Sequence, residues 1–513
     1  MLTGDTLYSQ GEREKQMAAA VESDLIIMTS ELLDSLTRRA KSERYDWMTK
    51  ETALLIADEA HLVTMEGRGH VIESALMRFT KLNPNAKICF LSATMKNVGE
   101  LGEWLTQLNG KKTTTIYNEW RPVKLEINYI EHPTPRNSWG KMDYQITQRE
   151  KEKMVVNLVM DKPDEKFLVF VHAKNTGRSI IRRLGEVGED ARFHNADLDS
   201  SDRKEIEESF KDRNKGIRVL VSTSTTAIGV NLPARNVVIV GVHRGINEVD
   251  ELDLIQECGR AGRPQYDDKG FVYLLVPEGT VSVWSEKINN PRPVTSIMNN
   301  HQILAFHVLA EIDNKEIKSE RELMSWYQRT LAYKQNINPF TNIDAEALMR
   351  DLEKMEMIGF NGIIPFVTGL GKISSWFYFS PWDVYAWYKN FSKIFARERD
   401  DLTMAWAIGD IPSNDPGYIG KDIQKDAEEI RWALRNRGIQ CSCAVGTVIG
   451  IYHSLMGMDM KEDDGLIRTI RRGIIFDIDR ITYALSLMDG MYAKWGKETI
   501  WKTLPQRIKY GIG

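Results

Sequence analysis

The sequence predicts an α/β protein whose first part holds parallel-sheet lobes and whose last part is largely helical. Short β-branched apolar runs alternate with longer amphipathic stretches up to about residue 280, which is typical of βαβ units whose strands are buried on both faces. Beyond about Pro291 this alternation stops and helical periodicity takes over. Because domains usually run to about 100 to 200 residues, the 513 residues predict three or four compact units.

Seven short apolar runs are the predicted strands. They lie at residues 25–28, 54–57, 88–91, 167–171, 219–222, 237–240 and 272–276. The order of strands and intervening amphipathic stretches fits two α/β lobes. We expect the boundary between the lobes near residue 120, at Trp120-Arg121-Pro122, since a polar stretch with two prolines follows soon after.

The C-terminal half contains one segment that does not read as helix, residues 360–381, which is rich in Gly, Phe, Tyr and Ser. Helices followed by a short hairpin are typical of a winged helix, and the remainder is expected to be all-α.

Composition restricts the class of protein. The formal net charge is -4, so any nucleic-acid surface must be local rather than global. The four cysteines, Cys89, Cys258, Cys441 and Cys443, frame no disulfide pattern and suit a reducing compartment. A structural zinc needs four ligands, so the Cys441-x-Cys443 pair is interpreted as packed or incidental thiols. No signal peptide or membrane-length apolar run occurs, and a cytoplasmic protein is expected, or a nuclear one in a eukaryote.

The most specific local pattern is an apolar strand, residues 54–57, that runs into Asp58-Glu59-Ala60-His61. Carboxylates at the C-terminal end of a strand lie where α/β sheets bind ligands. Asp58 is the candidate Mg²⁺ ligand, and Glu59 is the candidate base that orients and deprotonates an attacking water. The alternative is an acidic turn that merely closes a strand.

Two further patterns support a nucleotide-driven protein. Ser92-Ala93-Thr94 ends a strand, and its hydroxyls could couple the carboxylate turn to the opposite lobe. Arg260 and Arg263 are spaced i, i+3, so we expect them to share a helix face and to reach a phosphate presented by the other lobe. The alternative is a basic surface helix, which leaves the positions of Gln256, Gly259 and Gly262 unexplained.

Taken together, these motifs resemble those of superfamily-two helicases of the Ski-like branch. The resemblance rests on DEAH at 58–61, SAT at 92–94, VSTSTTAIGVNLPA at 221–234 and QECGRAGRPQYD at 256–267, in that order. It implies two RecA-like lobes, at residues 1–120 and 121–285, with ATP and Mg²⁺ as cofactors. It also implies a winged helix at 286–395 and a helical ratchet domain at 396–513.

The resemblance assigns site residues motif by motif. His61, Gln256 and the two arginines join the catalytic set, and Gly229 and Asn231 join the nucleotide site. The residues implied in nucleic-acid contact are Thr3, Gly4, Asp5, Thr29, Ser30, Glu31, His172, His194, Ser222 and Thr223. Such contacts position the strand without reading bases.

The resemblance continues through the C-terminal half. Residues 368–371 followed by an expected aromatic strand at 376–379 are similar to the winged helix of the family, and residues 464–488 and 504–513 to its ratchet helix and the helix that follows. Arg468, Arg471 and Arg472 are the implied polar contacts to the strand. Gly473 stands where an aromatic base-stacker aligns, with Phe476 as a substitute. The alternative is that these charged residues only form a solvated helical face and do not contact nucleic acid.

A phosphate-binding loop of the form GxxxxGK[ST] does not occur in the sequence, since none of the five Gly-Lys pairs is followed by Ser or Thr. Three explanations stand: a split motor completed by a second polypeptide, an incomplete record of a longer chain, or a relic that only binds nucleic acid. Under either of the first two explanations, a block at the N-terminus is missing and the first lobe is incomplete. The strands of that lobe then lack neighbours, and this chain alone is expected to be inactive.

The expected function is therefore an ATP-dependent helicase or translocase that acts on single-stranded or forked nucleic acid. The resemblance implies 3′ to 5′ travel. DNA is favoured because residues 286–395 leave no room for the long insertion of the RNA-processing members, and the chain is most like repair and fork-processing members, which include the helicase domain of DNA polymerase theta. The alternatives are an RNA helicase of the same branch and a non-catalytic scaffold. The segment 242–253 offers a short strand-separating hairpin with four acids, which predicts poor duplex unwinding.

Overall fold

The computed structural model describes residues 15, 18–38, 50–65, 67–92, 95–118, 120–136, 142–195, 198–212, 216–223, 232–245, 247–264, 266–337, 345–395, 400–414, 421–442, 444–460, 465–493 and 498–510. The chain forms two compact units. Unit 1 comprises Met1–Phe90, Glu100–Thr113 and Thr295–Gly513, and unit 2 comprises Leu91–Gly99 and Thr114–Val294.

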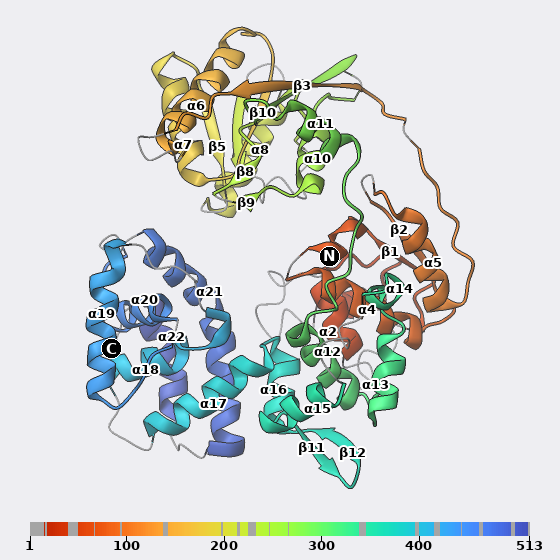
Figure 1. Ribbon diagram of the computed structural model, residues 1–513, viewed down its shortest axis with the longest axis vertical. Helices are drawn as coiled ribbons and strands as arrows, with labels where there is room; N and C mark the ends of the chain where they lie inside the picture. The colour runs from red at the N-terminus through yellow and green to blue at the C-terminus, as the bar shows by residue number, and fades with distance from the viewer. Residues whose placement is uncertain are drawn as a thin grey trace. The chain divides into compact units, whose positions relative to one another are not determined.

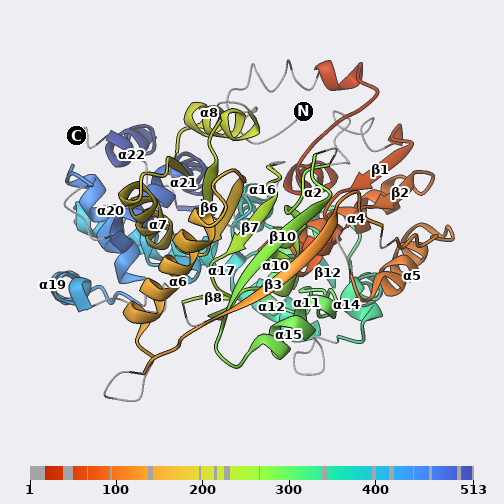
Figure 2. The same ribbon diagram turned by 90° about the horizontal axis from the view of Figure 1, so that it is seen from above.

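Unit 2 is built on a six-stranded sheet with the strand order β3-β10-β7-β4-β6-β5, in which all neighbouring strands are parallel (Figure 2). Its strands are β3 (Lys124–His132), β4 (Phe167–Val171), β5 (Ala191–His194), β6 (Val219–Thr223), β7 (Asn236–Ile239) and β10 (Lys269–Pro277). Its helices are α6 (Tyr144–Met160), α7 (Lys174–Glu186), α8 (Ser200–Lys211), α10 (Glu251–Gly259) and α11 (Val281–Asn289). This is the layered α/β architecture that the sequence predicts.

Alternate residues of the central strands feed two separate cores, one on each face of the sheet. Leu168 and Phe170 of β4 pack with residues of α8, α10 and α11. Phe167 and Val169 pack with residues of α6 and α7 on the other face. Because both faces are covered, β4 is buried throughout its length, as a continuous apolar run in a parallel sheet predicts.

The predicted strands of this unit are confirmed, but β3 and β5 were missed. Both lie at the edges of the sheet in the observed strand order. An edge strand is partly solvated, so β3 carries charged residues between its apolar ones and β5 is only four residues long. Neither therefore shows the apolar run that marks a central strand.

The N-terminal part of unit 1 holds a second parallel sheet of two strands in the described part of the chain, β1 (Leu54–Ala57) and β2 (Lys87–Phe90). Around it lie α2 (Ser30–Arg38), the 3₁₀ turn η2 (Ala60–Thr64), α4 (Gly69–Leu82) and α5 (Val98–Asn109). Leu54 and Ile56 of β1 are 50% and 53% exposed. The run at 25–28 forms no named strand, and only Met28 takes part in a bridge.

The rest of unit 1 is helical apart from one antiparallel hairpin, β11 (Ile358–Asn361) and β12 (Ile364–Val367). The hairpin lies beside α15 (Ala345–Lys354) and α16 (Gly369–Phe377) in Figure 1. The helices before it are α12 (His301–Asp313), α13 (Glu320–Tyr327) and α14 (Leu331–Lys334), and those after it are α17 (Pro381–Phe395), α18 (Asp401–Gly409), α19 (Lys421–Asn436), α20 (Val445–Leu455), α21 (Gly465–Met488) and α22 (Glu498–Tyr510), with short turns η4 (Pro412–Asn414) and η5 (Asp489–Ala493). The long helix predicted at 464–488 is confirmed as α21.

The aromatic strand predicted at 376–379 is wrong, because α16 runs to Phe377 and Tyr378 caps it. Thr368 accepts a hydrogen bond from Gly371 N and begins the helix, and Leu370 and Ile373 bury one face at helical spacing. Tyr378, with φ 58°, ends the helix in the left-handed region.

A buried ion network joins α2, α4 and α12 within unit 1. Asp34 pairs with Arg38 at 2.6 Å and also with Arg78, and Arg78 Nε donates to Glu311 at 2.6 Å. The two carboxylates balance the two guanidinium groups, so the network is neutral although all four side chains are nearly inaccessible to solvent.

Two histidines extend this network in a defined proton arrangement. Arg38 and Arg78 both donate to His307 Nδ1, at 2.9 and 3.2 Å, so that nitrogen must be an unprotonated acceptor. His307 Nε2 then carries the proton and donates to His70 Nδ1 at 2.8 Å. Burial lowers the pKa of His70 to about 4, and burial and the two arginines hold the pKa of His307 well below its usual range.

In the described part of the chain, no helix is long and apolar enough to cross a membrane.

Candidate functional site

The carboxylate turn lies at the C-terminal end of β1, as predicted. Asp58 is exposed, and its Oδ1 accepts a hydrogen bond from Glu59 N at 2.9 Å. Glu59 has φ 53° and ψ 44°, a left-handed conformation that is uncommon outside glycine and often marks functional positions. Its Oε2 lies 3.5 Å from Nδ1 of the buried His61. The turn therefore presents two carboxylates to solvent, with one held by a buried ring.

The exposed carboxylates suit a Mg²⁺ ion that is bound partly by water and substrate better than a metal ion enclosed by protein ligands alone. Among the residues with described positions, no group of three or more His, Cys, Asp or Glu side chains could hold a metal ion together. Mg²⁺ is commonly bound by one or two carboxylates, with waters and substrate phosphates completing its shell. The exposed Asp58 carboxylate fits that role, and Glu59, with a side chain 41% exposed, remains open to water.

The two arginines do not share a helix face, so that prediction is wrong. Helix α10 ends at Gly259, and Arg260 is its C-cap. The chain then turns through Gly262, with φ 88°, and Gly262 N donates to Ala234 O at 2.7 Å, which takes the following residues off the helix axis. Gln256 alone of the catalytic candidates in this motif lies on α10.

Arg263 is held by an acidic partner from its own motif. Its Nε and Nη2 each donate to the Asp267 carboxylate at 2.8 Å, and its backbone N donates to Asp267 Oδ2 at the same distance. Burial acts to raise the pKa of Asp267, but the bonds from Arg263 outweigh it and the pKa is lowered. The guanidinium is thus oriented before any ligand binds. The signal in the sequence for this contact is the aspartate four residues after Arg263.

Three candidates for nucleic-acid contact, Thr29, Ser30 and Glu31, form local contacts around the start of α2. Thr29 Oγ1 accepts from Leu32 N at 3.3 Å, and Ser30 Oγ donates to Glu31 at 3.3 Å. Glu31 pairs with Arg68 at 2.7 Å. Burial raises the pKa of Glu31, yet the Arg68 hydrogen bond and the other contacts lower it overall.

Several other candidates can only be partly placed. Ser92 is exposed just beyond β2. The candidates that lie outside the described residues are Thr3, Gly4, Asp5, Thr94, Gly229 and Asn231.

In unit 2 the strand-contact candidates lie at the carboxyl ends of three neighbouring strands, β4, β6 and β5. Ser222 and Thr223 end β6 and are buried. His194 ends β5, and its Nε2 lies 2.9 Å from Glu207 of α8. His172 follows β4, its Nε2 lies 2.8 Å from Gly241 O, and burial lowers its pKa to about 4.

The ratchet-helix arginines differ in exposure. Arg468 Nε donates to Met460 O at 2.9 Å, and the buried Arg471 donates to Ser454 Oγ at 3.0 Å and Met458 O at 2.8 Å. These two side chains therefore fasten α21 to the end of α20 and the segment after it. Arg472 is exposed, and Phe476 is 78% exposed, one helical turn further on.

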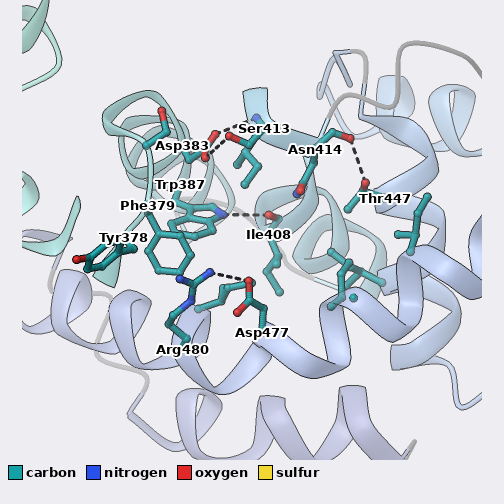
Figure 3. Close-up of a pocket in the computed structure, with 17 residues that line it drawn as sticks. Tyr378, Phe379, Asp383, Trp387, Ile408, Ser413, Asn414, Thr447, Asp477 and Arg480 are labelled. Carbon is teal, nitrogen blue, oxygen red and sulfur yellow. Dashed lines mark hydrogen bonds and ion pairs between the residues drawn. The ribbon is translucent and has the colours of Figure 1, made fainter. Parts of the chain in front are cut away.

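A cavity of about 550 Å³ lies beside α21 and is lined by residues of α17, α18, η4, α20 and α21 and of the segment before α17 (Figure 3). Gly473 is part of its lining, and a Cβ at this position would meet no atom within 4 Å. Arg480 forms another part of the wall, pairing with Asp477 at 2.6 Å and placing its guanidinium carbon 4.4 Å from the centre of the Phe379 ring. The glycine thus opens the helix surface toward a cavity.

The hairpin between the two helicase motifs of unit 2 is confirmed, and two of its four predicted acids pair with cations. β8 (His243–Arg244) pairs antiparallel with β9 (Asn247–Glu248). Glu248 pairs with Lys287, and Asp250 pairs with Arg292, whose backbone N also donates to Glu251 at 2.8 Å. These cations lie about forty residues later in the sequence and offset part of the acidity, and poor duplex unwinding by this segment stays a prediction.

Comparison with known proteins assigns helicase domains to both sheet regions. Residues 2–101 match the family described as DEAD/DEAH box helicase, and residues 150–265 match the helicase conserved C-terminal domain. These are the two domains of a superfamily-two helicase.

The chain is also similar to archaeal proteins named ATP-dependent DNA helicase Hel308. It is 28% identical to that of Thermoplasma acidophilum over 391 residues, which cover 70% of this chain and 55% of the relative. It is 31% identical to that of Pyrococcus horikoshii over 355 residues, covering 62% and 47%, and 31% identical to that of Methanococcus vannielii over 358 residues, covering 60% and 45%. The chain spans about half the length of the curated relatives it matches.

Proposed function

We propose that this chain is part of an ATP-driven DNA helicase of the Ski-like branch of superfamily two. The observation that carries the proposal is the Asp58-Glu59 turn: two carboxylates stand at the carboxyl end of a parallel strand, open to solvent, within a region that matches the DEAD/DEAH box family.

The nucleotide chemistry is assigned to residues of both units. Asp58 is suited to hold Mg²⁺, whose charge supports phosphoryl transfer when ATP is bound. Glu59 is placed to orient the attacking water and to accept its proton. Arg260 and Arg263 are assigned to the negative charge that develops on the transferred phosphoryl group. Gln256 and His61 are assigned to positioning within the same site.

The 513 residues contain no GxxxxGK[ST] loop, so the proposal includes a phosphate cradle supplied by further polypeptide, either a preceding segment or a second chain.

DNA is the proposed track because the similar archaeal proteins bear the name DNA helicase. Contacts from residues near α2, from the carboxyl ends of the unit 2 strands and from Arg472 would hold the phosphate backbone without reading sequence. We assign base stacking to the exposed Phe476, since aromatic faces stack on any base. Travel in the 3′ to 5′ direction follows from the resemblance to the branch.

The test is strand displacement by the chain together with the segment that supplies the phosphate cradle. Forked DNA with a 3′ single-stranded arm should be unwound with ATP and Mg²⁺, faster than forked DNA with a 5′ arm or forked RNA of the same sequence. Faster displacement of RNA would reassign the track. Tight binding of forks with no ATP turnover would overturn the helicase assignment in favour of a scaffold.

A further inference from the structure

The carboxyl edge of the unit 2 sheet collects basic groups from four different segments. His132 is the last residue of β3, and His172 follows β4. His243 lies in β8, shortly after β7, and Lys151 comes from α6. In a parallel sheet the carboxyl ends of all strands meet at one edge, which is where such sheets bind ligands. Of these groups only His172 was singled out from the sequence.

Lys151 reaches this edge by packing against Gly241. A Cβ built on Gly241 would lie 3.0 Å from Lys151 Nζ, and Gly241 has φ 101°, which L side chains rarely adopt. The carbonyl of the same glycine lies 2.8 Å from His172 Nε2. Gly241, two residues after β7, is therefore free of a side chain where the lysine ammonium passes, and the histidine bonds to its backbone.

The positive charge of Lys151 is only partly compensated nearby. Within the described ranges, Lys151 donates no hydrogen bond and forms no ion pair, although its side chain is partly buried. Burial lowers the pKa of Lys151 and the charge of the adjacent Glu152 acts in the opposite direction, but the Glu152 carboxylate is itself bonded to Arg183 at 2.7 Å and Ser179 at 2.8 Å. The ammonium nitrogen is not among the fully enclosed polar atoms that lack a partner, so solvent reaches it.

The hairpin after β7 adds one cation to this edge. Its acids Glu248 and Asp250 pair with Lys287 and Arg292. Arg244, in contrast, is exposed and makes no ion pair with any residue of described position. Lys151 and Arg244 are thus two cations at one sheet edge that are available to an anionic ligand.

Nearby charged side chains lower the pKa values of the histidines at this edge. Burial lowers the pKa of His132, and Lys151 and His243 lower it further. Burial lowers the pKa of His172 to about 4, with additional effects in the same direction from Arg244, Lys151 and His243. Burial likewise lowers the pKa of Lys151. An anion placed at this edge would relieve the repulsion.

We propose that Lys151, supported by Arg244, binds a backbone phosphate of the nucleic-acid strand at the carboxyl edge of the unit 2 sheet. The contact is a point charge on a phosphodiester and carries no base specificity. This inference rests on the proposed function, since it takes the nucleic-acid strand as the ligand. It adds a phosphate contact that originates in α6, outside the helicase motifs of the sequence.

The experiment measures the salt dependence of binding. Equilibrium binding of the 513-residue chain to single-stranded DNA oligonucleotides of mixed and of homopolymer sequence is followed as a function of salt concentration. Loss of one phosphate contact in Lys151→Met should weaken binding equally on all sequences and reduce the slope of log K against log salt by about one. Lys151→Arg should keep the slope of the parent chain.

The matched control is Lys153→Met on the same helix. Lys153 is exposed and paired with Glu150 at 2.6 Å, so its removal should leave the slope unchanged. Thermal unfolding confirms that all three variants are folded. If the parent chain binds and Lys151→Met has the parent slope, the inference is overturned while the proposed function stands. If the parent chain does not bind DNA at all, the proposed function itself fails.

Discussion

The two parallel sheets carry side chains of opposite charge at their carboxyl edges. At the carboxyl end of the first sheet, β1 is followed by Asp58 and Glu59, and at that of the second sheet lie Lys151, His172 and Arg244. The sheets also differ in burial: β1 alternates exposed and half-buried residues, whereas β4 is buried at every position.

Similar strand patterns can therefore support sites of opposite charge. Both sheets are built from short apolar runs, yet the first edge carries groups that attract a cation and the second carries groups that attract an anion. A metal-bound nucleotide suits the first and a phosphate backbone suits the second. The charge at the strand ends, not the strand pattern, separates the two.

The largest expected effect is on the acidic edge. In an assembly that hydrolyses ATP, Glu59→Gln should reduce kcat by about 10² to 10⁴-fold, because it removes the base but keeps size and hydrogen bonding. ATP binding should persist. Steady-state hydrolysis with a separate nucleotide-binding measurement checks both, and Glu51→Gln, an exposed glutamate just before β1, is the control. A near-normal kcat would show that another group is the base.

The second prediction tests the difference in burial with one substitution in each sheet. Leu168→Ala in β4, where the side chain is 1% exposed, should cost about 2 to 5 kcal/mol of unfolding free energy because it leaves a cavity. Leu54→Ala in β1, 50% exposed, should change it by about 0.5 kcal/mol or less. Urea unfolding followed by hydrogen exchange of each strand resolves the two units. Equal losses would mean that Leu54 is covered in solution.

The third prediction concerns pH. The pKa of His172 in unit 2 is lowered from its ordinary value to about 4, so the unfolded chain binds more protons than the folded one between those values. The contribution of neutral His172 to the free energy of unfolding is complete above about pH 6.5 and is lost as pH falls toward 4. At about 1.4 kcal/mol per pKa unit, the loss amounts to about 3 kcal/mol at most.

Unit 1 contains groups that act in opposite directions in the same range. The buried His70 and His307 act in the same direction as His172, but burial raises the pKa of Glu73 to about 7, so Glu73 loses stabilisation as pH rises from about 4.5 to 7. Glu73 therefore offsets part of the contribution of the two histidines. Glu73→Gln should steepen the pH dependence of unit 1, and His172→Gln should flatten that of unit 2. Unfolding free energies across this pH range provide the measurement, and a slope unchanged by both substitutions contradicts the assignment.

The sequence predicted the central parts of the fold because burial on both faces imposes a continuous apolar run. The strands of that kind were found, whereas the edge strands β3 and β5 were not, since partial solvation permits charged residues there. The helix α16 was mistaken for a strand because its aromatic residues suggested β structure, while the capping Thr368 pointed to a helix.

Site residues could be predicted from the sequence where their role depends on their position at the end of one strand. Residues whose role depends on tertiary contacts with distant parts of the chain could not be predicted in this way. Asp58 and Glu59 follow β1 as expected. The pairing of Glu248 with Lys287, and the packing of Arg471 against Ser454, are tertiary contacts that no local pattern shows. Lys151 was overlooked for the same reason, because only the fold brings α6 to the sheet edge.

The smallest expected effect tests whether neutralisation of the hairpin acids preserves the positive character of the second edge. Lys287→Gln with Arg292→Gln would leave Glu248 and Asp250 without their cations. The restored acidity should repel a phosphate backbone and weaken single-stranded DNA binding by about 1 kcal/mol or less, as expected for exposed charges. Lys269→Gln is the control, since Lys269 pairs with Glu126 and begins β10, at the opposite end of the sheet from the hairpin. The effect should shrink at high salt, because exposed charges are screened. If the double variant binds as the parent chain does at low salt, the hairpin lies away from the strand and the positive edge is confined to Lys151 and its neighbours.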